Sequence, residues 1–247
     1  MLLKNKTVVL TGSNRGIGKS ILEILSKNGA NVFACVRTID EKFLIDIENL
    51  KNSYKNDIIP VQIDLLDEES VKQAGKKILE QKKEIDVLIN NAGAIHTALF
   101  QMTSQDKLKE MFQVNFFSQA LFTQYILKSM IKKKNGSIIF ISSNSAIDSN
   151  IGRSAYSASK AAIISLSKTL SRELGGQNIR VNTVAPGLTT TDMMKNNTSD
   201  KAVEEYVSSV SVKRLGKPNE IADLVIFLSS DKSNYITGQV IRVDGGI

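Results

Sequence analysis

Ser143, Tyr156 and Lys160 are the residues whose types and spacing could do chemistry. Tyr156 and Lys160 are four positions apart, so on a helix they project from one face, close enough to interact. A lysine ammonium there favours phenolate, and we expect it to lower the pKa of Tyr156 from its usual value of about 10. Ser143 follows an apolar stretch at 137–142 and could donate a hydrogen bond to a carbonyl oxygen. Together the three predict proton transfer to or from an oxygen on carbon.

The Tyr–Lys pair acquires meaning only beside a cofactor site, because such a spacing also arises by chance in a lysine-rich chain. A glycine-rich turn supplies the expected site: it follows a buried strand at 7–11 and leads into a helical pattern that ends at Gly29. Glycines let the backbone approach a pyrophosphate, whose charge the N-terminus of the following helix stabilises. The residues of this turn are Gly12, Ser13, Asn14, Arg15, Gly16, Ile17 and Gly18.

The residues after the second expected strand, 31–36, indicate which dinucleotide is bound. An acid there would bind the 2′-hydroxyl of NAD, but this chain has Arg37 and Thr38. Arg37 and Arg15 could clamp a 2′-phosphate, since the planar guanidinium makes bidentate hydrogen bonds. The alternative is that both are ordinary surface arginines. We expect NADP(H).

Two further polar groups interrupt apolar stretches. Asn90 to Gly93 follows an expected strand at 86–89, where small and amide residues fit a crevice beside a cofactor or form a simple polar turn. Asn115 lies among apolar residues in a segment, 104–132, that we expect to be one long helix or a broken pair. A buried asparagine must find partners, so Asn115 is either a structural bridge or part of the site.

Strands and helices alternate along the chain, and the strands are almost continuously apolar. This pattern predicts a parallel sheet covered by helices on both faces, an α/β fold. Residues 188–217 are polar and read as a loop, placed where a substrate lid would lie. The remaining strands are expected at 58–63, 179–184 and 239–243, and the remaining helices at 40–54, 67–83, 154–174 and 218–228.

Composition limits the functions that the chain could have. Its 247 residues suit one large α/β domain, and the only cysteine, Cys35, lies in an apolar run. A single histidine, His96, argues against a histidine metal centre, so we expect no metal. The net charge is +7, but the lysines are interspersed with carboxylates along the helical stretches, a pattern that disfavours nucleic-acid binding. The lysines at 132–134 could nevertheless attract an acidic partner. We expect no membrane span and, with a strand beginning at Thr7, no signal peptide, so we place the protein in the cytoplasm.

In this order and spacing, these motifs resemble those of the short-chain dehydrogenase/reductase family almost from end to end. The resemblance implies a single domain over 1–247, with a Rossmann-like, doubly wound, seven-stranded parallel sheet between two helical layers. It also implies a catalytic tetrad of Asn115, Ser143, Tyr156 and Lys160. The residues that carry it are Thr11, Gly12, Gly16, Gly18, Asp64, Asn90 to Gly93, Asn115, Ser143, Tyr156, Lys160, Asn182, Pro186, Gly187 and Asp244 to Gly246.

The family pattern assigns a role to each member of the tetrad. The tyrosine transfers the proton, the serine orients the carbonyl, the lysine binds the nicotinamide ribose, and the asparagine holds a water of the proton relay. Besides the glycine turn, Arg37, Thr38, Tyr156 and Lys160, the resemblance implies that the cofactor contacts Asp64, Leu65, Asn91, Ala92, Gly93, Pro186, Gly187, Thr189 and Thr191.

The nearest subgroup is that of the 3-oxoacyl-acyl carrier protein reductases, which implies reduction of a 3-oxoacyl thioester and acyl carrier protein as a partner. Lys134 matches a basic position of their docking surface, but Gln177 replaces another, and Ala94 to Thr97 departs from their pattern after strand four. The alternatives are an NADP-dependent enzyme acting on a sugar, polyol or small ketone, and a nucleotide-binding protein without chemistry. The resemblance also implies a homotetramer, assembled through 104–132, 154–174 and the C-terminal strand.

Overall fold

The computed structural model describes residues 1–247 and contains one seven-stranded, all-parallel sheet with the strand order β3-β2-β1-β4-β5-β6-β7. The chain reverses its direction of winding between β1 and β4, so the fold is doubly wound and leaves a crevice at the carboxyl ends of these strands. The strands are β1 (Thr7–Thr11), β2 (Asn31–Val36), β3 (Ile58–Gln62), β4 (Val87–Asn90), β5 (Gly136–Ile141), β6 (Ile179–Pro186) and β7 (Val240–Val243).

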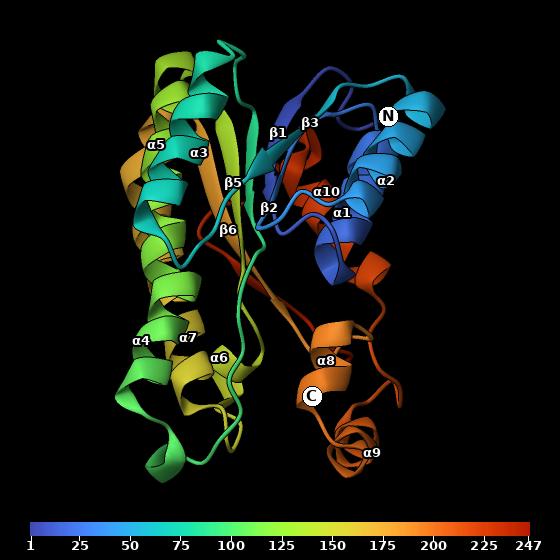
Figure 1. Ribbon diagram of the computed structural model, residues 1–247, viewed down its shortest axis with the longest axis vertical. Coiled ribbons are helices and arrows are strands. Elements are labelled where there is room, and N and C mark those ends of the chain that lie inside the picture. The colour runs from blue at the N-terminus through green and yellow to red at the C-terminus, as the bar shows by residue number, and fades with distance from the viewer.

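Helices form a layer on each face of the sheet (Figure 1). One layer consists of α1 (Gly16–Lys27), α2 (Glu41–Tyr54) and α10 (Pro218–Ser229). The other consists of α3 (Glu68–Glu80), α4 (Gln105–Phe112), α5 (Ser118–Lys133) and α7 (Ser154–Leu174). None of the helices has the length and apolar character needed to cross a membrane.

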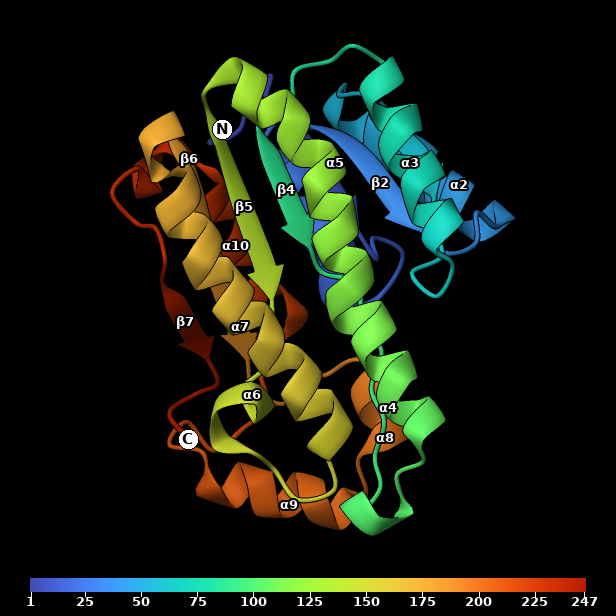
Figure 2. The same cartoon turned by 90° about the vertical axis from the view of Figure 1, so that its left-hand side faces the viewer.

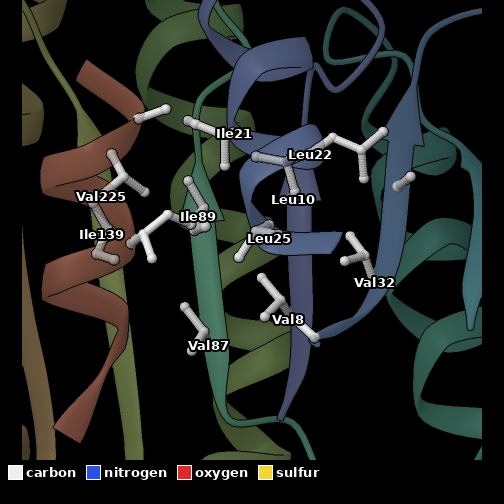
Figure 3. Close-up of a cluster of buried hydrophobic side chains, with 14 of the residues drawn as sticks. Val8, Leu10, Ile21, Leu22, Leu25, Val32, Val87, Ile89, Ile139 and Val225 are labelled. Carbon is white, nitrogen blue, oxygen red and sulfur yellow. The ribbon is translucent and has the colours of Figure 1, made fainter. Parts of the chain in front are cut away.

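Side chains of the central strands alternate between two hydrophobic cores, one on each face. Val8 and Leu10 of β1 pack with Ile21 of α1 and Val225 of α10 (Figure 3), whereas Val9 belongs to the core on the α3, α5 and α7 side. Because both faces are covered, every residue of β1 is buried and the strand reads as a continuous apolar run. The expected parallel sheet with two helical layers is confirmed.

The expected strands and long helices match the structure to within a few residues, but three segments differ. Of the two alternatives expected for 104–132, the broken pair is confirmed: a π-helix that was not expected, η2 (Gln113–Phe117), separates α4 from α5 and contains Asn115. A short helix that was not expected, α6 (Ser145–Asp148), follows β5. Brief 3₁₀ turns, η1 (Phe100–Met102), η3 (Gly175–Gln177) and η4 (Asp231–Ser233), complete the structure.

The expectation that residues 188–217 form a loop is wrong. The segment holds α8 (Asp192–Asn197) and α9 (Asp200–Ser209), which lie near the carboxyl ends of the strands (Figure 2). Thr191 and Ser199 cap the two helices by accepting hydrogen bonds from backbone N–H groups of the first turn. Both helices are short and mostly polar, so they lack the apolar periodicity that would have identified them.

A charged cluster lies at the opposite, amino-terminal edge of the sheet. The carboxylate of Asp86, only 8% exposed, accepts hydrogen bonds from the backbone N–H of Thr7 and from Lys133 Nζ, both at 2.8 Å. Lys133 also pairs with the exposed Glu84 at 3.1 Å. Lys133 is therefore engaged within the fold, and only Lys132 and Lys134 of that lysine run are exposed.

Asp86→Ala should lower the free energy of unfolding by about 2 kcal/mol, because it leaves an ammonium and a buried N–H without their shared acceptor. The matched control is Glu84→Ala, which removes an exposed partner of the same lysine and should cost within about 0.5 kcal/mol. Urea denaturation of the two variants measures both values, and equal effects would contradict this role of Asp86.

Candidate active site

The glycine turn between β1 and α1 is built for close approach of a phosphate. Gly12 and Gly16 have positive φ angles of 69° and 53°, and a Cβ on Gly18 would lie 1.8 Å from the carbonyl oxygen of Gly12. Arg15 is the N-cap of α1, but no side chain caps the helix and its first turn contains no acid. The free N–H groups of this helix end therefore fit the pyrophosphate of a dinucleotide.

Two exposed arginines flank this turn. Arg15 and Arg37 have no carboxylate within ion-pair distance, and Thr38 beside Arg37 is also exposed. The next acid, Asp40, is occupied: its side chain accepts a hydrogen bond from the N–H of Phe43 and caps α2. The charge at the end of β2 is therefore positive, as a 2′-phosphate requires.

The other residues expected around the cofactor also hold the loops at the carboxyl ends of the strands. Asn91 donates to the carbonyl oxygens of Thr11 and Gly12 at 2.9 and 3.1 Å, which ties the end of β4, followed by Ala92, to the glycine turn. Asp64 accepts from the N–H of Leu66, Leu65 accepts from Ser118 through its carbonyl oxygen, and Ser13 donates to Cys35. Asn14 is exposed at the turn and Ile17 packs on the core under α1.

Asn115 joins three segments through its buried side-chain amide. Its Oδ1 accepts from the N–H of Ala94, and its Nδ2 donates to the Ala94 carbonyl and to Ser159 Oγ, at 2.9 to 3.0 Å. Ser159 donates in turn to the carbonyl oxygen of Tyr156 on α7. Of the two expected roles of Asn115, the structure therefore contains the bridge, and it places this bridge beside Lys160 and Tyr156.

Lys160 is fully enclosed and has no carboxylate partner. Its Nζ donates to the carbonyl oxygen of Ile141 at 2.8 Å, while Ser142 Oγ donates to the carbonyl oxygen of Lys160. A Cβ on Gly93 would lie 3.2 Å from this Nζ and 3.0 Å from Asn115 Oδ1, so the loop after β4 passes close to both side chains and a larger residue at 93 would be tightly packed against them. Burial lowers the pKa of Lys160 from 10.5 to about 8.

Tyr156 and Ser143 lie close to each other. Ser143, at the end of β5, is 8% exposed and accepts from the N–H of Ser145 at the start of α6. Burial raises the pKa of the Tyr156 phenol above 10, and the nearby Ser143 hydroxyl and Arg153 charge oppose that rise. The expectation that Lys160 lowers the pKa of Tyr156 is therefore wrong for this structure, in which the ammonium is directed at Ile141.

The segment after β6 closes over the glycine turn. Thr191 approaches Gly16, since a Cβ on Gly16 would lie 3.3 Å from Thr191 Cγ2. Tyr206 of α9 contacts the backbone at Gly187, accepts from the N–H of Leu188 at 3.0 Å and donates to the carbonyl of Asp244. Pro186 ends β6, and Thr189 is 5% exposed beside it. All four residues expected to reach the cofactor from this segment therefore lie at the crevice edge of the sheet.

The chain is similar to known proteins along its whole length. A family model described as enoyl-(acyl carrier protein) reductase matches residues 12–247. The 3-oxoacyl-[acyl-carrier-protein] reductases FabG of Thermotoga maritima and Aquifex aeolicus are 37% and 38% identical to it, over 100% and 99% of this chain and 99% and 98% of theirs. A solved structure described as a short-chain dehydrogenase/reductase family protein superposes with a TM-score of 0.87 at 30% identity, over 100% of this chain and 98% of the other.

The chain belongs to the short-chain dehydrogenase/reductase family. It is thus an oxidoreductase of that family, and its fold is the Rossmann-like fold expected from the sequence. A further solved structure is described as a candidate NAD(P)-dependent gluconate 5-dehydrogenase from Beutenbergia cavernae with NADP bound at low occupancy. It has a TM-score of 0.90 at 28% identity, over 98% of this chain and 96% of the other.

Several residues at the site were not identified from the sequence. Ser159 relays the Asn115 bridge to α7, and its position three after Tyr156 was an available signal. Arg153 contacts Asn197, and Tyr206 contacts Leu188, through tertiary packing that no local sequence pattern reveals. His96, by contrast, was expected from the sequence to be either a substrate contact or an ordinary surface-loop residue; it is partly buried in the loop after β4, and its Nε2 has no hydrogen-bond partner.

Replacement of Lys160 by methionine tests the burial of its ammonium. The pKa of Lys160 is about 8 in the folded protein and 10.5 in the unfolded chain. Between these two pH values the unfolded chain binds more protons than the folded protein, so the stability of the wild type rises with pH. Lys160→Met lacks this penalty, and its stability advantage over wild type should shrink by up to about 3 kcal/mol as the pH rises through the window. Urea denaturation of cofactor-free protein near pH 7 and pH 10 measures the change, and a constant difference would contradict the shifted pKa.

Proposed function

We propose that this chain is an NADPH-dependent carbonyl reductase that converts 3-oxoacyl thioesters to 3-hydroxy products. The observation that carries the proposal is the convergence of Ser143, Tyr156 and Lys160 beside a glycine turn that fits a dinucleotide. Full-length similarity to 3-oxoacyl-[acyl-carrier-protein] reductases supports the substrate class. NADP in a structural neighbour and the unpaired Arg15 and Arg37 support the cofactor.

In this proposal, Ser143 and Tyr156 act on the substrate oxygen, whereas Lys160 and Asn115 position the groups around it. Reduced nicotinamide, when bound, supplies hydride to the carbonyl carbon. Ser143 donates a hydrogen bond to the developing alkoxide, and Tyr156 gives it a proton. The raised pKa of Tyr156 suits this direction, because the phenol is protonated at neutral pH. Lys160 holds the ribose of the cofactor, and Asn115 holds the loop and a relay water in place.

The surroundings of the tetrad complete the proposal. We infer that residues 1–247 form one domain and that 188–217 is the lid over the substrate. Exposed Lys132 and Lys134 are available for acyl carrier protein. Exposed apolar side chains near α4 and α5, Phe100, Met102 and Phe117, are 54 to 73% exposed, which supports a homotetramer built through these helices.

A sugar, polyol or other small ketone is the alternative substrate, favoured by the structural neighbour described as a gluconate 5-dehydrogenase.

A C=C reduction, suggested by the name of the family model, fits less well. An enoyl thioester has no oxygen on the reacting carbon, so Ser143 and Tyr156 would have no group there to polarise. A nucleotide-binding role without chemistry would not need the enclosed Lys160, whose burial costs stability.

NADPH oxidation with a short 3-oxoacyl thioester, followed by absorbance, tests the proposal. The comparison substrates are the matching 2-enoyl thioester, ketoses, a keto sugar acid and small cyclic ketones. We expect the 3-oxoacyl thioester to have the highest kcat/KM. Preference for a ketose or keto acid would contradict the thioester assignment.

Tyr156→Phe removes only the proton donor and should lower kcat at least about 100-fold, since general acid catalysis typically contributes that much. NADPH affinity, measured by nucleotide fluorescence, should stay within about threefold of wild type, because the glycine turn is intact. A variant within about tenfold of wild-type turnover would contradict the role of Tyr156.

Arg37→Asp should shift the cofactor preference from NADPH toward NADH, because a carboxylate repels the 2′-phosphate and accepts from the 2′-hydroxyl. Arg172→Asp is the matched control, since Arg172 is also exposed but lies on α7 outside the glycine turn. The ratio of kcat/KM for the two cofactors should move by about tenfold or more in the first variant only. An unchanged ratio in Arg37→Asp would refute the phosphate clamp.

A further inference from the structure

Arg153 is the residue just before α7, three positions ahead of Tyr156. Its guanidinium is partly buried, and one nitrogen, Nη2, donates to the Asn197 carbonyl at 2.9 Å and to Thr198 Oγ1 at 3.4 Å. The other terminal nitrogen, Nη1, is inaccessible to solvent and has no hydrogen-bond partner. Such an orphaned donor is uncommon in folded proteins and calls for an explanation.

No other arginine of the chain is in this situation. Arg180 is buried but donates to three backbone carbonyls, and Arg242 makes a two-pronged pair with Asp148 and a further bond to Asp244. The remaining arginines, Arg15, Arg37, Arg172 and Arg214, are exposed. Arg153 alone combines partial burial, no carboxylate partner and an empty donor position.

The position of Arg153 relates this empty donor to the reaction. Arg153 is the N-cap residue of α7 and Tyr156 lies in the first turn of that helix, so the two side chains start from the same helix end. Arg153 is close enough for its charge to act on the phenol of Tyr156. A substrate whose reacting oxygen is bound by Tyr156 would therefore place an oxygen two carbons away within reach of the guanidinium.

The same side chain also holds the segment that covers the site. The Asn197 carbonyl, at the end of α8, accepts from Arg153 and, at 3.5 Å, from Thr97 Oγ1 of the loop after β4. The backbone N–H of Ala98 donates to the Gly152 carbonyl, which joins these two loops beneath α8. Movement of α8 away from this junction would uncover the guanidinium while substrate enters.

We propose that Arg153 is a specificity-determining residue whose Nη1 donates a hydrogen bond to the C1 carbonyl of a 3-oxoacyl thioester, while Nη2 keeps α8 closed over it. This inference rests on the proposed function. A 3-oxoacyl thioester carries its two carbonyl groups in a 1,3 relation, so one molecule satisfies both Tyr156 and the empty donor. A simple ketone of the same length leaves Nη1 without a partner and binds less well for that reason.

The experiment compares two substrates that differ only at C1. One is a 3-oxobutanoyl thioester of a short thiol, and the other is the 3-oxobutyl thioether of the same thiol, in which a methylene replaces the C1 carbonyl. Arg153→Ala should lower kcat/KM for the thioester by about 10- to 100-fold and for the thioether by less than about threefold. If thioether turnover is slow, its inhibition constant against the thioester supplies the comparison.

Two further variants separate substrate binding from closure of α8. Thr198→Val removes one lid contact of Nη2 but leaves Nη1 in place, so it should affect both substrates by the same factor. Arg153→Lys should restore part of the thioester activity, since it returns a cationic donor. NADPH affinity and thermal unfolding of each variant report whether the fold is intact.

Equal losses on both substrates in Arg153→Ala would overturn the inference and leave Arg153 a lid contact only. That result differs from failure of the proposed function, in which the wild-type enzyme itself would not reduce the thioester. A thioester-selective loss with unchanged NADPH affinity is the result that the proposal requires.

Discussion

The site depends on one buried amide, that of Asn115. Its side chain satisfies the backbone of Ala94 in both directions and reaches Ser159, so that the loop after β4 and helix α7 are fixed to each other. The ordinary α-helical ladder is interrupted at this point by the π-helix that contains Asn115. Without a polar partner in the protein interior, this amide would be costly to bury, so the bridge and the local distortion of the helix stabilise each other.

Burial also shifts the pKa values of the two titratable side chains beside this bridge. Enclosure of Lys160 lowers its pKa to about 8, and burial raises the pKa of Tyr156. At neutral pH both groups therefore carry a proton, with the phenol facing Ser143 and the ammonium held on the Ile141 carbonyl. This state is suited to protonation of an alkoxide. The stability lost by enclosing an unpaired ammonium is compatible with the large hydrophobic cores on both faces of the sheet.

Much of the fold and of the proposed site could be predicted because the relevant signals are local. The strands 7–11 and 31–36 are continuous apolar runs, and the glycine turn lies between a strand and a helix, where its meaning is clear. The bridge made by Asn115 was not predicted because its partner, Ala94, is 21 residues away, and no local pattern marked the π-helix that contains Asn115. The direction of the Tyr156 pKa shift was missed for a related reason, since spacing places Lys160 on the same face but does not determine where its ammonium points.

Helices α8 and α9 illustrate a different limit. Their caps, Thr191 and Ser199, are visible in the sequence, but neither helix has a buried residue, so no apolar stripe marks them. Arg153 shows the same dependence on tertiary structure, because its burial arises from the approach of Asn197. A cavity of about 230 Å³ between α1 and α2 is lined by Ser13 and Asn14 of the glycine turn but not by any residue of the tetrad.

Hydrogen exchange at the Ala94 amide tests most directly whether Asn115 assembles the site. In the wild-type protein this N–H is bonded to Asn115 Oδ1 and should be protected, as are the amides of Leu88 and Ile89 in β4. In Asn115→Leu, which keeps the volume but not the amide, exchange at Ala94 should accelerate roughly tenfold or more while the β4 amides stay protected. Unchanged protection at Ala94 would contradict the account.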